Sequence, residues 1–352
     1  MGQMTKPLIS VVMCVYNGEK YIYEAIKSIL AQTVTDFEFI IVNDGSIDKT
    51  EEIILSFNDA RIVYIKNEKN LRIIKSSNKG VDISKGKYIA RMDSDDIAVP
   101  DRFEKQLKVF DLYPGVDIVN ANAYFLTEDG TQYREQKSLT TTFSFETLRF
   151  LIYLQNFIYN PTVMVKATQV KKYRYFDDES REHIEDYDLW LRMLNDGCIC
   201  YTIEDRLFYY RDNSTSINHT KKSSQVERMA LICNEMLGKS FNFRFDQPSF
   251  EILLAEGGKI DFASIKKINQ EIIKYTSLIK EKYPLSKTAY NEMNLWRKQK
   301  VIVVTLKSFK QISIKAKISL LLFLASHLGW FTYKSVRTLI KRTIFTKYRN
   351  RV

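Results

Sequence analysis

A short apolar run that ends on three carboxylates, the stretch Tyr88–Asp96, is the feature that most constrains how this chain folds. Apolar strands do not normally stop on Asp93, Asp95 and Asp96, because like charges so close together repel each other unless a cation lies among them. Clustered carboxylate oxygens suit Mg²⁺ or Mn²⁺, and such ions usually bind a substrate phosphate as well. The stretch predicts a metal-bridged diphosphate site at the end of a strand, with a solvated acidic turn as the alternative.

Strand-like and helix-like segments alternate through the first third of the chain. Five apolar runs are expected to be strands, at residues 9–16, 37–42, 62–66, 88–92 and 116–125, and the segments between them have helical spacing. Such alternation predicts a mainly parallel sheet with helices on both faces. Ligands of these sheets bind beyond the carboxyl ends of the strands, an edge called the rim below. Asp44 follows the second strand, so the topology brings it to the same rim as Asp93, Asp95 and Asp96.

The following segment contributes a second group of candidate residues. We expect a helix within residues 143–154, a strand within 160–166, a loop at 173–183, a helix at 185–194, and strands at 198–202 and 207–210. Glu185 and Asp186 lie in the first turn of the second of these helices, and Arg211 ends the last strand. The domain organisation expected is therefore an α/β domain that binds its ligand at the rim, over residues 1–220, and a basic, amphipathic helical region over residues 221–352.

The excess positive charge of the chain is confined to its C-terminal end. The formal net charge is +11, yet 14 of the 53 Lys and Arg lie in Arg297–Val352, which contains no Asp or Glu. The rest of the chain holds 39 basic and 42 acidic residues. The run Val301–Leu306 is β-like, whereas residues 317–344 combine an apolar stretch with a basic face. This pattern predicts association with an anionic membrane surface, with a solvated basic helix as the alternative.

Composition excludes several classes of protein. The four Cys form no CxxC pair and there are only three His, so neither a zinc site nor a disulfide framework is expected. No segment like a signal peptide opens the chain, and we therefore expect a cytoplasmic protein that binds the inner face of the cell membrane peripherally. A nucleic-acid binder would use the basic tail but would have no use for the acidic rim, so nucleic acid is not an expected partner.

The N-terminal two thirds resembles the family 2 glycosyltransferases, which have the GT-A fold, and the resemblance covers roughly residues 7–220. Five motifs that are weak alone occur in the order of the family: Ser10–Gly18, Ser28–Gln32, Asn43–Asp48, Gly86–Asp96 and Glu185–Trp190. The resemblance implies an inverting, metal-dependent enzyme of the bacterial surface-polysaccharide type. Such an enzyme moves a sugar from a nucleotide-diphosphate donor, usually a UDP-sugar, to an acceptor hydroxyl. A lipid-linked glycan is the acceptor that would suit the basic tail.

On the donor side, the resemblance implies a role for several residues of the motifs. Val15 and Tyr16 would line the nucleoside pocket, and Asp44 would hydrogen-bond the base. Asp93 would face the ribose and sugar. Arg211 would lie near the phosphates, with a surface salt bridge as the alternative.

The metal and the proton transfer are assigned to carboxylates. Asp95 would hold Mn²⁺ or Mg²⁺, although Asp96 is close enough in sequence to be the ligand instead. Asp186 would act as general base towards the acceptor hydroxyl, and Glu185 is its nearest competitor. The alternative is a purely structural role, in which Asp44 caps the helix after its turn and Asp186 interacts with a helix dipole.

Two departures from the family pattern bear on the site. Arg72 stands where the family usually has Gly, which could reshape the loop near the donor, and Asn213 stands where a His often follows the Arg. The alternative function is a sugar-phosphate nucleotidyltransferase, which shares the chemistry of nucleotide and metal. That enzyme would need a Gly-rich, basic phosphate loop after the first strand, and Tyr16–Lys20 matches such a loop poorly.

Overall fold

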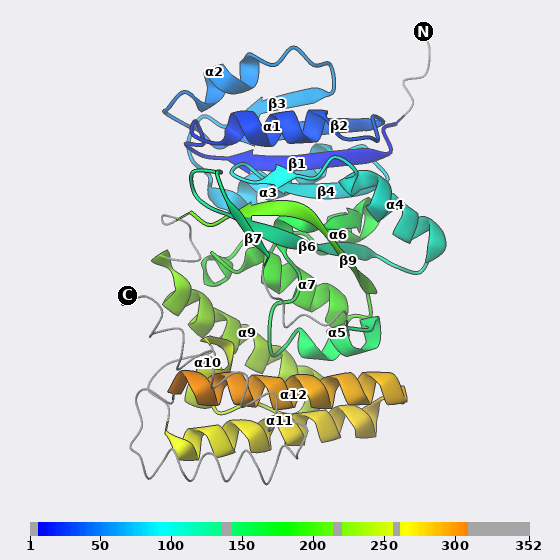
Figure 1. Ribbon diagram of the computed structural model, residues 1–352, viewed down its shortest axis with the longest axis vertical. Coiled ribbons are helices and arrows are strands. Elements are labelled where there is room, and N and C mark those ends of the chain that lie inside the picture. Colours follow the sequence, from blue (N-terminus) through cyan, green and yellow to red (C-terminus); the bar gives the residue numbers. More distant parts are fainter. Residues whose placement is uncertain (1–5, 136–142, 214–219, 256–260, 309–352) are drawn as a thin grey trace, which may run out of the picture. The chain divides into compact units, whose positions relative to one another are not determined.

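The computed structural model describes residues 6–135, 143–213, 220–255 and 261–308. The chain divides into two compact units, Met1–Gln225 and Val226–Val352. The first unit is built around one nine-stranded sheet, and the described part of the second consists of helices (Figure 1).

The first half of the sheet is parallel, as the sequence predicted. Its strands are β1 (Ile9–Val15), β2 (Phe37–Asn43), β3 (Ile62–Lys66) and β4 (Tyr88–Asp93), arranged in the order β3-β2-β1-β4. The helices between and after them are α1 (Ile22–Leu30), α2 (Thr50–Leu55), α3 (Arg72–Ile83) and α4 (Arg102–Leu112). Because β1, β2 and β4 run side by side in one direction, their carboxyl ends form the rim.

The second half of the sheet mixes directions. The short strand β8 (Met164–Lys166) pairs antiparallel with both β4 and β6 (Ile118–Leu126), and β6 pairs parallel with β9 (Cys200–Arg211). Two further strands complete the sheet, β5 (Ile97–Ala98) against β9 and β7 (Tyr133–Glu135) against β6. The two strands expected at 198–202 and 207–210 are one strand, because a register shift opposite Asn122 lets β9 continue through the polar residues between them.

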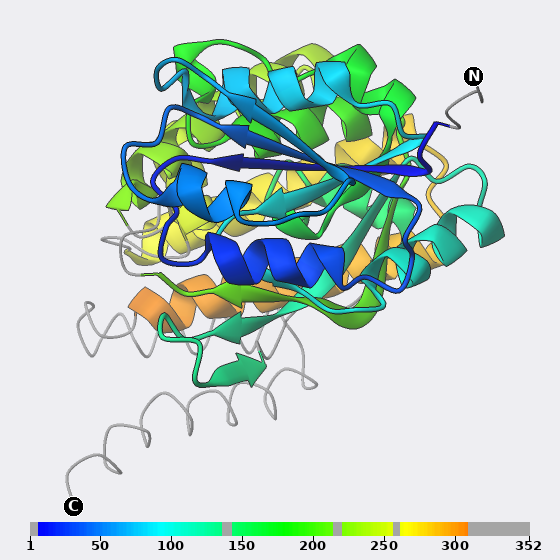
Figure 2. The same cartoon turned by 90° about the horizontal axis from the view of Figure 1, so that it is seen from above.

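Alternate side chains of the parallel strands pack on opposite faces of the sheet. Figure 2 shows α1 (dark blue) and α3 (light blue) on opposite sides of the strands. Val11, Phe39 and Ala90 belong to the core beneath α1, whereas α3 packs closely on the other face at Gly80. A Cβ at Gly80 would lie 2.6 Å from Val12 Cγ1, so this contact requires glycine. The expected helices on both faces are therefore confirmed.

The described part of the second half of this unit contains the helices α5 (Phe145–Leu151), α6 (Ala167–Tyr173) and α7 (Glu185–Asn195), with 3-10 turns at Asn160–Thr162 and Glu179–Arg181. Helix α7 carries the candidate base in its first turn. It is held by Asp188, whose two oxygens accept from Nε of Arg181 at 3.0 Å and Nε of Arg192 at 2.8 Å. Since Arg192 also donates to the carbonyls of Tyr173 and Arg174, the same group fixes the segment before α7.

The second unit contains α9 from Val226 onwards (Lys222–Phe241), α10 (Gln247–Ala255), α11 (Phe262–Lys282) and α12 (Lys287–Ser308). An aromatic cluster forms its core, in which Phe245 stacks on Phe250 with the ring centroids 4.5 Å apart. The expectation of a β-like run at Val301–Leu306 is wrong. Those residues continue α12. The side chains of Val301, Ile302 and Val304 are buried, and their spacing suits one face of a helix.

The apolar and basic segment at residues 317–344, on which the membrane prediction depends, lies outside the described residues. Within the described ranges, no helix combines the length and the apolar character needed to cross a bilayer.

Candidate active site

Two loops at the rim, one after β1 and one after β2, are hydrogen-bonded to each other. The side chain of Asn17 accepts from the N–H of Ile47 at 3.0 Å, and the N–H of Gly18 donates to Oγ1 of Thr50 at 2.8 Å. The N–H of Asp44 donates to the carbonyl of Val15 at 2.8 Å. These bonds place Asp44 beside the end of β1, next to Tyr16, whose side chain is half exposed.

Asp44 itself is buried, and one of its oxygens is already used. Oδ1 accepts from Nδ2 of Asn67 at 2.8 Å and from the N–H of Leu71 at 2.9 Å. Oδ2 accepts no hydrogen bond from the part of the chain that the structure describes. The carboxylate is therefore oriented from behind and keeps one oxygen for a ligand. The interpretation of Asp44 as only a helix cap is not supported, since Asp48 makes the bonds to Thr50.

Asp93, Asp95 and Asp96 follow one another at the end of β4 but have different surroundings. Burial, together with the charges of Asp95 and Asp186, raises the pKa of Asp93 to about 7 against the opposing charge of Arg91. Asp93 and Asp95 are both part-exposed, whereas Asp96 is 1% exposed. Burial also raises the pKa of Asp96 well above its usual range.

Arg211 lies behind this loop and bonds to it twice. Its backbone N–H donates to Oδ1 of Asp96 at 2.7 Å, and its Nε donates to the carbonyl of Asp95 at 2.8 Å. The other two guanidinium nitrogens donate to the carbonyl of Glu128 at 3.1 Å and to Oε2 of Glu24 at 2.8 Å. All three nitrogens thus have partners within the protein, and the predicted contact of Arg211 with phosphate stays a prediction.

Asp186 and Glu185 begin α7 on the same side of the sheet as Asp93. Oδ1 of Asp186 accepts from the N–H of Tyr187, which leaves Oδ2 without a hydrogen bond from the described residues. Burial raises the pKa of Asp186, and burial followed by the charge of Asp186 raises the pKa of Glu185 to about 8. Oε2 of Glu185 is buried and has no partner among the described residues. Electrostatic interaction between Asp93 and both residues shows that the topology brings the two acidic groups together.

The sequence analysis missed Arg91, a buried cation among these carboxylates. Its side chain is 2% exposed, Nη2 lies 3.4 Å from Oγ of Ser77, and Nε and Nη1 have no hydrogen-bond partner among the described residues. Its positive charge opposes the upward pKa shifts of Asp93 and Asp186. The available signal was an arginine inside an apolar run, two residues before Asp93 and therefore on the same face of the strand.

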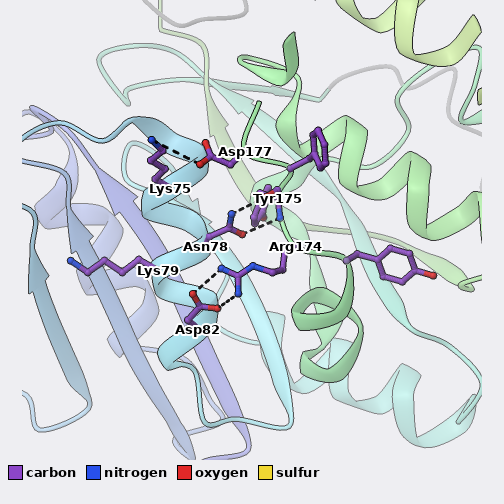
Figure 3. A pocket seen from close by; sticks show the side chains of 9 residues that line it. Lys75, Asn78, Lys79, Asp82, Arg174, Tyr175 and Asp177 are labelled. Atoms are coloured by element: carbon purple, nitrogen blue, oxygen red, sulfur yellow. Dashed lines mark hydrogen bonds and ion pairs between the residues drawn. The ribbon is translucent and has the colours of Figure 1, made fainter. Parts of the chain in front are cut away.

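A groove of about 560 Å³ runs along α3 beside the segment that leads to α7 (Figure 3). Polar pairs cross it: Arg174 with Asp82, Asn78 with the backbone of Tyr175, and Lys75 with Asp177. Figure 3 shows Lys79 pointing away from these pairs, and its Nζ donates to Oδ1 of Asn67, the residue that orients Asp44.

Arg72, the first residue of α3, adds a further polar pair between α3 and the segment before α7. Its Nη1 donates to Oε1 of Glu182 at 2.8 Å, which joins the loop after β3 to the segment before α7. Arg72 has φ of 69°, the region that favours glycine. The departure from the family pattern therefore adds an ion pair without removing the backbone conformation that a glycine would adopt.

The carboxylates at the end of β4 suit a divalent metal ion whose remaining ligands come from the substrate. Within the described ranges, no group of three or more His, Cys, Asp and Glu is close enough to hold a metal by itself. Asp93 and Asp95 instead form a part-exposed pair of carboxylates at the rim, with the hard oxygen atoms that such an ion prefers. Mg²⁺ and similar ions are commonly bound by one or two carboxylates together with substrate phosphates.

Comparison with known proteins identifies the family. The model for "Glycosyl transferase family 2" matches residues 10–174. An uncharacterized glycosyltransferase of Methanocaldococcus jannaschii is 41% identical over 215 residues, which are 60% of this chain and 73% of that protein. The chain belongs to glycosyltransferase family 2.

Other similar proteins agree with this assignment. An uncharacterized glycosyltransferase of Haemophilus influenzae is 32% identical to this family 2 glycosyltransferase over 247 residues, 65% of this chain and 76% of the relative. Among solved structures, TarS residues 1–349 of S. aureus in complex with UDP-GlcNAc has a TM-score of 0.53, at 16% identity and 85% and 88% coverage.

The mannosyltransferase PcManGT of Pyrobaculum calidifontis, in complex with GDP-Man and Mn²⁺, has a TM-score of 0.54, at 14% identity and 88% and 89% coverage. At these identities the solved structures show the fold alone. They confirm the predicted GT-A architecture of the family 2 glycosyltransferase, and the family favours glycosyl transfer over the alternative of a nucleotidyltransferase.

Proposed function

We propose that this family 2 glycosyltransferase is a metal-dependent inverting enzyme that uses a nucleotide-diphosphate sugar, with UDP-sugars the first donors to test. The observation that carries the proposal is the convergence of two acidic groups on one rim: Asp93 and Asp95, at the end of β4 and just after it, and Asp186 of α7. Asp44, with one oxygen kept for a ligand, lies on the same rim at the end of β2. The convergence supports a donor and an acceptor held side by side.

The donor would lie across the ends of β1, β2 and β4. Val15 and Tyr16 would form a wall of the nucleoside pocket, and Oδ2 of Asp44 would accept from an N–H of the base. Asp93 would face the ribose and sugar, and Asp95 would hold Mn²⁺ or Mg²⁺. Such a metal, when bound, neutralises the charge that develops on the leaving diphosphate.

Asp186 would take the proton of the acceptor. As the acceptor oxygen forms its bond to the anomeric carbon, the bond from that carbon to the diphosphate breaks, and the hydroxyl proton moves to Oδ2 of Asp186. One displacement inverts the anomeric centre. Burial supports this role, because a carboxylate whose pKa is raised by burial is a stronger base than a free aspartate.

The experiment is a panel of UDP-, GDP- and dTDP-sugars, each with and without Mn²⁺, scored by donor hydrolysis and by thermal stabilisation of the full chain. We expect one nucleotide class to stabilise the protein and to be hydrolysed slowly, both more strongly with metal. A chain that responds to none of these donors, with or without metal, would contradict the proposal.

We further propose that the acceptor is a glycan on a lipid carrier and that the basic residues from Arg297 onwards bind the inner, anionic face of the cell membrane. The support is the charge distribution of the sequence. Co-sedimentation with vesicles containing anionic lipid tests this, comparing the full chain with one ending at Ser308, the last residue of α12. Equal sedimentation of the two chains would exclude the segment after Ser308 as the anchor.

A further inference from the structure

The end of β9 is joined to the carboxylate loop by a buried arginine. Arg211 is 2% exposed, and its guanidinium lies 4.5 Å from the centre of the Tyr21 ring. It bonds Asp95 through Nε, while its backbone N–H bonds the side chain of Asp96. Both bonds hold the loop from the side of the protein interior. The side chain of Asp95 is left part-exposed on the other side.

The same guanidinium ties this loop to two other parts of the chain. Nη2 bonds Glu24 on α1, and Nη1 bonds the carbonyl of Glu128 in the turn after β6. The turn is shaped to receive it, since Gly130 has φ of 73° and a Cβ there would lie 3.1 Å from Nη1. Lys20 also bonds Oε1 of Glu128, at 2.8 Å. Arg211 thus fixes the loop relative to the core helix α1 and not only to its own strand.

From this geometry we infer that Arg211 is a positioning residue for the metal-binding carboxylate Asp95, acting through the main chain of Asp95 and the side chain of Asp96. The inference rests on the proposed function for the identity of the metal ligand. It gives Arg211 a role different from a contact with phosphate, because all three guanidinium nitrogens donate within the protein.

Physical reasoning supports an effect on metal affinity. A carboxylate binds a small hard cation well only when its oxygens are held in place, and groups behind a ligand typically change metal affinity by about 10–100-fold. Asp95 is held here by a charge-assisted hydrogen bond to its carbonyl, a stronger kind of bond than one between neutral groups. The bond from the backbone N–H of residue 211 to Asp96 is available to any non-proline side chain at this position, so replacing the arginine side chain tests the bond to the carbonyl of Asp95.

The test compares Arg211→Met and Arg211→Lys with a matched arginine elsewhere. Arg61 makes similar bonds, to both oxygens of Asp59 and to the carbonyl of Leu30, before the start of β3 and hence at the opposite end of the strands. Arg61→Met is therefore the control for the loss of a part-buried, bonded arginine.

Two measurements on the full chain separate the possible roles. The first is the affinity for Mn²⁺ in the presence of saturating UDP or GDP, followed by the electron paramagnetic resonance of free Mn²⁺. We expect about a 10-fold or larger loss for Arg211→Met, a partial loss for Arg211→Lys and no change for Arg61→Met. The second is the nucleotide affinity in EDTA, which should change less than about twofold. An unchanged Mn²⁺ affinity, or a loss of metal-free nucleotide affinity as large as the loss of Mn²⁺ affinity, would overturn the inference.

A third measurement does not depend on the enzyme's function. Hydrogen exchange of the peptide covering residues 93–98, in the metal-free protein, should be at least about tenfold faster in Arg211→Met and unchanged in Arg61→Met. If the wild type binds no nucleotide, the proposed function fails, and this measurement still decides whether Arg211 fixes the loop. If Arg211→Met does not fold, Glu24→Ala removes the exposed acceptor that Nη2 of Arg211 bonds on α1. This substitution should lower the affinity for Mn²⁺ by about two- to fivefold. An unchanged affinity would count against the positioning role of Arg211.

Discussion

The backbone N–H of Arg211 lies 2.7 Å from Oδ1 of Asp96, so this carboxylate is held against the end of β9. Its other oxygen is buried and has no hydrogen bond from the described residues. Three adjacent carboxylates that the sequence could not tell apart thus have two different surroundings. Asp93 and Asp95 reach the rim, whereas Asp96 belongs to the interior.

Asp95→Asn should raise the Mn²⁺ concentration needed for half-maximal donor hydrolysis by at least about tenfold, because an amide is a weaker ligand than a carboxylate. Asp96→Asn should change it by less than about threefold, since the amide keeps an Oδ1 that accepts from Arg211. Metal titrations of the two variants check this. If the required Mn²⁺ concentration rises more in Asp96→Asn than in Asp95→Asn, then Asp96 is the metal ligand instead of Asp95.

Asp186→Asn should keep nucleotide-sugar affinity and lower the rate of transfer by about 10²–10⁴-fold, the usual contribution of a positioned base. Donor affinity is measured by thermal shift and transfer by product formation with an accepted glycan. Glu185→Gln is the matched comparison, since it removes the neighbouring carboxylate. Full transfer by Asp186→Asn together with a large loss in Glu185→Gln would make Glu185 the base.

Glu185→Gln also gives a prediction about pH. Because burial holds the pKa of Glu185 at about 8 in the folded protein against an ordinary 4.5, the folded state binds a proton that the unfolded state releases between these pH values. The free energy of unfolding should therefore fall as the pH rises from about 5 to about 8. Removing this carboxyl should flatten that slope, making the variant more stable than the wild type at pH 8 by on the order of 3–4 kcal/mol, since each unit of pKa difference contributes about 1.4 kcal/mol, with most of the difference gone at pH 5. Urea unfolding at both pH values measures it, and parallel profiles would contradict the buried state of Glu185.

Asp44→Asn should weaken nucleotide binding at least about tenfold while leaving the melting temperature nearly unchanged. The amide keeps the Oδ1 that accepts from Asn67 and Leu71, but it replaces Oδ2 with an NH₂ group. An NH₂ group donates and does not accept, so it would lose the proposed hydrogen bond from the N–H of the base. Calorimetry with UDP checks the affinity. Wild-type affinity in this variant would remove Asp44 from the nucleoside site.

Asp188→Ala should destabilise the first unit by about 3–5 kcal/mol, because it leaves Arg181 and Arg192 without their shared buried partner. The matched control is Asp82→Ala, which breaks the exposed pair with Arg174 and should cost less than about 1 kcal/mol. Denaturant unfolding measures both. Equal losses would mean that the burial of Asp188 adds nothing to its two ion pairs.

Much of the fold follows from local sequence signals. The apolar runs of β1, β2 and β4 are continuous because both faces of these strands are covered, so their extent and parallel pairing could be predicted. The run at Val301–Leu306 could not be assigned correctly, because a short row of β-branched residues also suits a buried helix face. The split of β9 into two strands failed for another reason, since its pairing with β6 bridges a polar interruption.

For the site, the sequence indicated which residues gather at the rim but not how each is held. The partners of Asp44, Asp96 and Arg211 come from segments distant in the chain, and no local pattern records such contacts. Arg91 was missed because its importance depends on burial beneath Asp93, which periodicity does not reveal. The functional roles assigned to the carboxylates and to Val15 and Tyr16 stay predictions.

The ion pair between Arg72 and Glu182 has a consequence for how the two sides of the rim are coupled. It links the loop that orients Asp44 to the segment before Asp186, and the Arg72 side chain is 64% exposed. Both Arg72 and His183, the neighbour of Glu182, have positive φ, so the connection holds two backbone positions in a conformation that costs about 1–2 kcal/mol per residue. Exposed charges are screened over about 8 Å at physiological ionic strength. Raising the salt concentration is therefore expected to weaken this link between the segment that orients Asp44 and the segment before α7, while the packed cores beneath them stay unchanged.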